Sequence, residues 1–89
     1  MPKILMEAQL SKGFDHWVGF FDADKEVLLA NGFTPIYRGH KLEEPNTVVV
    51  LMEGDPSKIQ EFMSQPEQAK VIEEAGHIVE TTKVTVLSD

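Results

Sequence analysis

The residues best suited to chemistry in this chain form two short groups. His16 and Trp17 are adjacent in the first, and Tyr37, Arg38 and His40 are nearly consecutive in the second. Arginine can hold an anionic oxygen, and histidine, with an ordinary pKa near 6.5, can move a proton at neutral pH. Aromatic rings supply apolar walls that carry one hydrogen-bonding group. We therefore take these five as candidate ligand-binding residues for a small acidic or carbonyl-bearing molecule.

Each candidate also has a purely structural explanation. Trp17 lies on the apolar stripe of an expected helix, where packing in the core accounts for it. Arg38 can reach solvent along its aliphatic stem from an edge strand, whereas in a pocket Glu7 of a central strand is its possible buried partner. Histidines at the rim of a fold need no function. The pocket and the structural explanation both remain open.

The sequence does not point to a metal or a cofactor, and we expect neither. There are no cysteines, which excludes disulfides and thiolate metal sites. The three histidines, His16, His40 and His77, belong to one end of the expected fold. However, His40 and His77 lie on opposite edge strands, roughly 14 Å apart at nearly 5 Å per strand. No paired carboxylates, phosphate-binding glycine loop or nucleophile elbow occurs either.

Charge narrows the choice of partners. The net charge is −7, from 15 acidic and 8 basic side chains, and such a surface repels phosphate backbones and anionic lipids. We therefore expect no nucleic-acid and no membrane partner. No apolar run approaches the roughly 20 residues of a membrane span. Glu7 interrupts the apolar N-terminus before it could form a signal peptide, so we expect a cytoplasmic protein.

The stretch Thr47–Met52 determines the expected architecture. It is apolar at nearly every step, which indicates a strand that is buried on both faces. A chain of 89 residues forms one domain, 1–89, with helices enough for one face of a sheet. Small domains without disulfides are often reinforced by association. We therefore expect a homodimer that forms through the sheet face.

The elements follow from the spacing of apolar residues. Strands are predicted over 3–9, 33–42, 47–53 and 78–87, with a long helix over 13–31. A second helical region begins at Asp55-Pro56, is interrupted near Pro66 and ends at Gly76. The order β-α-β-β-α-β with right-handed crossovers predicts an antiparallel sheet of order 4-1-3-2, a ferredoxin-like α+β fold. Pro35 then falls on an edge strand, where its missing N–H is tolerated.

The hairpin between the second and third strands decides where the candidate residues face. A turn over Glu43–Asn46 would pair Leu42 with Thr47. Arg38 and His40 would then lie opposite Leu51 and Val49 on one face, and Tyr37 would lie opposite Met52 on the other.

Three motifs resemble a known family: Phe14-Asp15-x-Trp17-Val18-x-x-Phe21-Asp22, Gly32-Phe33-x-Pro35-x-Tyr37-Arg38-Gly39 and Glu44-Pro45-x-Thr47-Val48-Val49-Val50. The family comprises small cyanobacterial and marine bacterial proteins of unknown function within the dimeric α+β barrel superfamily. The resemblance implies two sheets packed face to face about a two-fold axis, with helices outside. The superfamily includes cofactor-independent monooxygenases, lactone isomerases and haem-handling proteins, so the fold alone fixes no reaction.

These observations leave three functional hypotheses. The first is a homodimer that binds a small molecule or acts as an interaction module. The second is a cofactor-independent monooxygenase or isomerase for a small carbonyl-bearing or aromatic compound, in which Arg38 holds an anionic oxygen and His16 or His40 moves protons. The third is a regulatory ligand-binding domain at a dimer interface. RNA binding is disfavoured, because the strand Val48–Met52 lacks the base-stacking aromatics of RNA-recognition domains.

Overall fold

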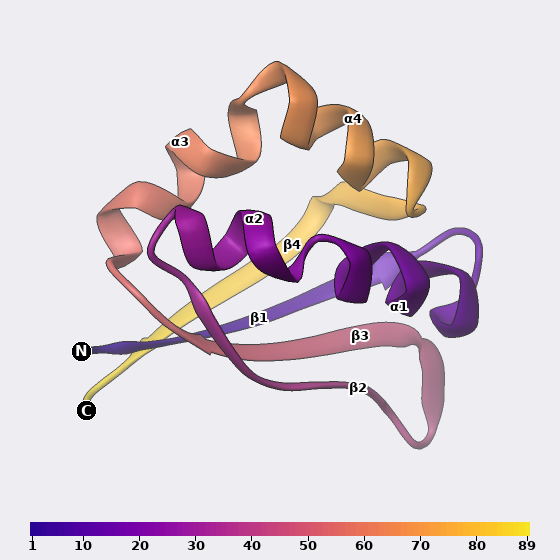
Figure 1. Ribbon diagram of the computed structural model, residues 1–89. Helices are drawn as coiled ribbons and strands as arrows, with labels where there is room; N and C mark the ends of the chain where they lie inside the picture. Colours follow the sequence, from indigo (N-terminus) through magenta and orange to yellow (C-terminus); the bar gives the residue numbers. More distant parts are fainter.

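The molecule has two layers, a four-stranded antiparallel sheet and a layer of helices (Figure 1), and the computed structural model describes all residues, 1–89. Its strands are β1 (Lys3–Leu10), β2 (Thr34–Lys41), β3 (Glu44–Glu53) and β4 (His77–Leu87). Their spatial order is β2-β3-β1-β4, which is the predicted 4-1-3-2 order counted from the other edge. The prediction of a ferredoxin-like α+β fold is confirmed, and Pro35 lies on the edge strand β2 as expected.

The helices are shorter than the sequence pattern indicates. The expected helix over 13–31 is divided at Asp24 into α1 (Phe14–Ala23) and α2 (Lys25–Ala30). The second region consists of a 3-10 turn, η1 (Pro56–Lys58), followed by α3 (Ile59–Ser64) and α4 (Pro66–Glu74). Pro66 starts α4 because proline fits the first helical position but cannot continue a preceding helix. None of these helices is long and apolar enough to cross a membrane.

All four helices lie on the same face of the sheet, as Figure 1 shows. Alternate residues of β1 and β3 point toward them and are buried, and the core is completed by side chains of the helices and loops. The fully buried members include Ile4, Val48 and Val50, while Phe33 packs on Phe62 at 5.4 Å between ring centroids. Burial of this one face is therefore what holds the helical layer to the sheet.

The opposite face of the sheet, here called the open face, has no cover within the chain. Leu5, Val49 and Leu51 of the two central strands point to this side and are half-buried. The strand that was predicted to be buried on both faces is thus covered on one. A lone subunit leaves apolar side chains of its central strands in contact with solvent.

The register of the hairpin between β2 and β3 differs from the predicted register by one residue. Its turn is Leu42-Glu43, so that Lys41 pairs with Glu44 and β3 begins before Pro45. The pairing is interrupted next to the turn, where β3 has more residues than β2. Beyond this irregularity, Arg38 pairs with Val50. A shift of one residue moves every side chain to the other face. The prediction that Arg38 and His40 share a face of the sheet with Leu51 and Val49 was therefore wrong.

With the observed register, the candidate residues of β2 change sides. Arg38 and His40 share the helix-covered face with their partners Val50 and Val48. Tyr37 instead pairs with Leu51 on the open face. Its ring lies over Gly39, where an added Cβ would come within 2.8 Å of the phenol ring carbon Cζ.

Two isoleucines test the described core, because Ile4 is buried under the helices and Ile36 is exposed on the edge strand β2. We expect Ile4→Val to lower the free energy of unfolding by about 0.5–1.5 kcal/mol, because it removes a buried methyl group and leaves a cavity. Ile36→Val is the matched control, since Ile36 is 47% exposed on β2 and should change stability by less than about 0.5 kcal/mol. Urea unfolding measures both values. Equal effects of the two substitutions would contradict the described core.

Candidate functional site

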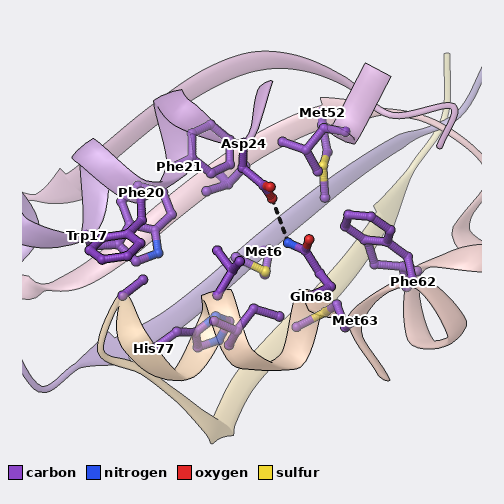
Figure 2. Close-up of a pocket in the computed structure, with 16 residues that line it drawn as sticks. Met6, Trp17, Phe20, Phe21, Asp24, Met52, Phe62, Met63, Gln68 and His77 are labelled. Carbon is purple, nitrogen blue, oxygen red and sulfur yellow. Dashed lines mark hydrogen bonds between the residues drawn. The ribbon is translucent and has the colours of Figure 1, made fainter. Parts of the chain in front are cut away.

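A cavity of about 70 Å³ lies between the helices and the sheet (Figure 2). The pair α1–α2 forms one wall, the pair α3–α4 forms the other, and β1 and β3 form the floor. Thirteen of its sixteen lining residues are hydrophobic. The apolar lining includes Met6, Val50 and Met52 from the sheet, Trp17, Phe20 and Phe21 from the first helix pair, and Phe62 and Met63 from the second.

Trp17 connects the core to this cavity. It is the only tryptophan of the chain, and its side chain is 4% exposed. Its ring stacks on that of Phe21 at 4.8 Å and contacts that of Phe14 at 5.8 Å between centroids. The two explanations that the sequence left open are therefore compatible, because Trp17 is a core residue and also a cavity wall.

Three polar residues interrupt the apolar lining: Asp24, Gln68 and His77. Gln68 is buried in α4, and its Nε2 donates a hydrogen bond of 2.6 Å to Oδ2 of Asp24. Asp24 occupies the break between α1 and α2, which brings its carboxylate to face the other helix pair. Figure 2 shows this hydrogen bond crossing between the two walls.

His77 was expected at the rim of the fold, but the structure buries it. It follows Gly76, which ends the helical region with a φ of 83°, and it pairs with Leu10 on the helix-covered face. Nε2 of His77 lies 2.8 Å from Oγ1 of Thr82. Burial lowers the pKa of His77 below its ordinary value, so the ring is uncharged at neutral pH.

Arg38 lies outside the cavity. Its Nε and Nη2 donate hydrogen bonds of 2.6 and 2.7 Å to the two carboxylate oxygens of Asp22 on the outer side of α1. These bonds hold the pKa of Asp22 below its usual range and raise that of Arg38. The possible pairing of Arg38 with Glu7 does not occur, because Glu7 faces Lys41 across the open face at 3.7 Å.

The remaining candidates also lie away from the cavity. Nε2 of His16 donates to the carbonyl oxygen of Glu74 at 2.9 Å, and thereby connects α1 to the end of α4. Nδ1 of His40 contacts the carbonyl oxygen of Lys41 at 2.9 Å, and its ring meets the ring of Phe14 edge-on. Tyr37 is 55% exposed on the open face. Of the five candidate residues, Trp17 alone lines the cavity.

Sequence reasoning missed all three polar residues of the cavity, Asp24, Gln68 and His77. In the sequence alone, a solvated acidic face of the first helix, with Asp15, Asp22, Asp24 and Glu26, adequately explains both Asp22 and Asp24. Their partners are 16 and 44 residues away in the chain, and no local pattern reveals such pairs. The burial of His77 depends on the β1–β4 register, which places it opposite Leu10 on the covered face and which the sequence alone does not supply.

The cavity favours uncharged ligands, because its largely apolar lining penalises the transfer of any ion from water. Its lining includes no lysine or arginine, and its histidine is neutral at neutral pH, so an anion would find no cationic partner. A carboxylate, a carboxamide and a neutral imidazole can instead exchange hydrogen bonds with an uncharged molecule. No three histidine, cysteine, aspartate or glutamate side chains converge as metal ligands would.

Residues 3–89 match the family described as a domain of unknown function, DUF3764. The chain belongs to this family. No curated protein matches the DUF3764 chain in sequence. The cyanobacterial or marine origin that the resemblance implied stays a prediction.

Solved structures share the fold of this DUF3764 chain. A Bordetella bronchiseptica protein assigned by name to the antibiotic biosynthesis monooxygenases has a TM-score of 0.76 at 7% identity, over 99% of this chain and 95% of its own. A Nitrosomonas europaea protein with the same assignment has a TM-score of 0.62 at 11% identity, over 100% and 98%. A conserved Methanosarcina mazei protein has a TM-score of 0.63 at 14% identity, over 99% and 91%. At these identities the likeness shows the fold alone.

The buried state of His77 can be tested through the pH dependence of stability. Because its pKa is lowered on folding, the unfolded chain binds the proton more readily once the pH falls below the ordinary value of 6.5. The free energy of unfolding should therefore decrease as the pH drops below about 6.5, and this contribution should level off below the folded-state pKa. Urea unfolding between about pH 8 and pH 5 measures the slope. His77→Gln should make this slope shallower, and an unchanged slope would contradict the assignment.

Proposed function

We propose that this DUF3764 chain is a homodimer that binds a small, largely apolar and uncharged molecule in the cavity between its helices and its sheet. The observation that supports binding is the composition of the cavity. Small-molecule sites are typically apolar, with a few polar groups that fix orientation, and here Asp24, Gln68 and His77 are such groups.

The cavity is too small for a ring-sized ligand unless side chains move, so we expect the ligand to displace side chains as it enters. The cavity holds about 70 Å³, whereas a benzene ring has been accommodated in a cavity of roughly 150 Å³. A second hollow of about 360 Å³ between α3, α4 and β4 shares Ile59, Met63 and Ile72 with the cavity walls. Met63 is half-buried, and methionine adapts readily because its side chain is unbranched. Its reorientation would join the two spaces.

The homodimer is supported by the open face. Leu5, Val49 and Leu51 form an apolar centre there, and burying such area contributes about 25 cal/mol per Å². Charged side chains on this face pair with one another: Lys41 with Glu7 at 3.7 Å, and Lys3 with Glu53 at 3.9 Å. Two copies can therefore approach through this face despite the net charge of −7.

A single charge on the open face should break the proposed dimer. We expect the native chain to sediment as a dimer at micromolar concentration and Leu51→Asp to sediment as a folded monomer, because an unpaired carboxylate in the interface is costly. Leu29→Asp is the control, since Leu29 is 47% exposed on α2, and it should remain a dimer. A native chain that sediments as a folded monomer would refute this part of the proposal.

Trp17 is a natural reporter for the cavity, because it is the only tryptophan and lines the cavity wall. We expect millimolar cyclohexanol, an uncharged compound that does not absorb at the tryptophan wavelength, to change Trp17 fluorescence saturably and to raise the unfolding temperature. Arg38→Ala should leave the affinity unchanged, because Arg38 pairs with Asp22 outside the cavity. Lack of saturation, or loss of binding in Arg38→Ala, would count against the cavity as the site.

The alternative function is a cofactor-independent monooxygenase or isomerase that acts on a small carbonyl-bearing or aromatic compound. It is favoured by the uncharged His77 in the cavity, which can accept a proton, and by the fold shared with proteins named as antibiotic biosynthesis monooxygenases. The roles first considered for Arg38, His16 and His40 do not fit this cavity, since none of the three lines it. Formation of a product, measured by mass spectrometry, separates catalysis from binding.

A further inference from the structure

The orientation of the Gln68 carboxamide is fixed by its partner. The two ends of a glutamine amide are usually hard to distinguish, because either the nitrogen or the oxygen could face a neighbour. An ionised carboxylate accepts hydrogen bonds but cannot donate them. The amide atom that lies 2.6 Å from Oδ2 of Asp24 must therefore be the nitrogen, and the amide oxygen of Gln68 must point elsewhere.

That oxygen, Oε1 of Gln68, has no partner in the chain. The only side-chain hydrogen bond of Gln68 is the one to Asp24, although the residue is 92% buried, with 8% of its surface exposed. Every side-chain oxygen that is fully sealed from solvent has a hydrogen-bond partner. Because Oε1 has none, it is not sealed and must border open space. Gln68 lines the cavity, and Figure 2 shows its carboxamide reaching in among the cavity side chains.

The free oxygen determines which ligand can satisfy it. A carbonyl oxygen of an amide accepts hydrogen bonds and cannot donate, so its ligand partner must carry an O–H or N–H group. A ligand that covers this oxygen without donating to it seals an unpaired acceptor away from water, which costs free energy and disfavours ligands that carry only acceptors. The neighbouring Asp24 carboxylate also repels anions, and no lysine or arginine lines the cavity to offset that repulsion.

We propose that Gln68, held in one orientation by Asp24, is the specificity-determining residue of the cavity and selects uncharged, largely apolar molecules that carry a hydroxyl or N–H donor. This inference rests on the proposed function, because it presupposes that the cavity binds a small molecule. Asp24 is a positioning residue in this arrangement: it acts on the ligand through the carboxamide that it orients.

Three ring compounds of similar size test the selection. Cyclohexanol carries a donor, cyclohexanone carries only an acceptor, and cyclohexanecarboxylate is an anion. We expect isothermal titration calorimetry, which the ultraviolet absorbance of the ketone does not affect, to show cyclohexanol binding about three- to tenfold more tightly than cyclohexanone, as one net hydrogen bond provides. We expect no saturable binding of the carboxylate.

Two variants and a control separate the roles of the residues. Gln68→Met keeps the length of the side chain but removes the acceptor, so the ratio of the two affinities should fall to about one. Asp24→Asn lets the Gln68 amide turn over and present its N–H groups, so cyclohexanone should gain affinity relative to cyclohexanol. Asp22→Asn, on the outer side of the same helix, removes a similar charge and should leave the ratio unchanged.

The outcomes distinguish this inference from the function on which it rests. Failure of both cyclohexanol and cyclohexanone to bind would refute the proposed function. Equal affinities in the native protein, or an unchanged ratio in Gln68→Met, would refute the selection by Gln68 while the cavity remained a binding site. An unchanged ratio in Asp24→Asn would refute the positioning role of Asp24.

Discussion

The structure depends on one constraint: the chain has helices for only one face of its sheet. Strands alternate their side chains between faces, and the central strands β1 and β3 carry apolar residues on both. The helices cover Ile4, Val48 and Val50, whereas Leu5 and Val49 on the other side remain half-buried. The same shortage of helices that makes the core one-sided leaves an apolar face that a second copy can cover.

The cavity is a consequence of how that single helical layer is divided. Asp24 interrupts the first helix and Pro66 separates α3 from α4, so the layer consists of two short pairs rather than two long rods. Two side-chain hydrogen bonds join the pairs, one from Gln68 to Asp24 and one from His16 to the carbonyl oxygen of Glu74. The space that the short helices fail to fill lies on both sides of the Gln68–Asp24 bond, and the break in the first helix supplies Asp24 to its lining.

The sequence predicted what depends on local patterns. The positions of the strands, their order, the edge position of Pro35 and the burial of Trp17 all follow from apolar spacing and turn residues. The site depended on two quantities that local patterns do not encode. One is the β2–β3 register, where the choice of Leu42-Glu43 as the turn moved Arg38 and His40 to the other face. The other is long-range pairing, which assigned Asp24 to Gln68.

The proposed interface and the proposed ligand site occupy opposite faces of the same two strands. Met6 and Val50 form part of the cavity floor, while their chain neighbours Leu5 and Val49 belong to the open face. No open-face residue lines the cavity, so a single subunit already contains the complete lining. Because β1 and β3 are shared, however, a partner that orders these strands on one side also fixes the floor on which a ligand rests. The proposed association and the proposed ligand binding would in this way be separate in their contacts but joined through one backbone.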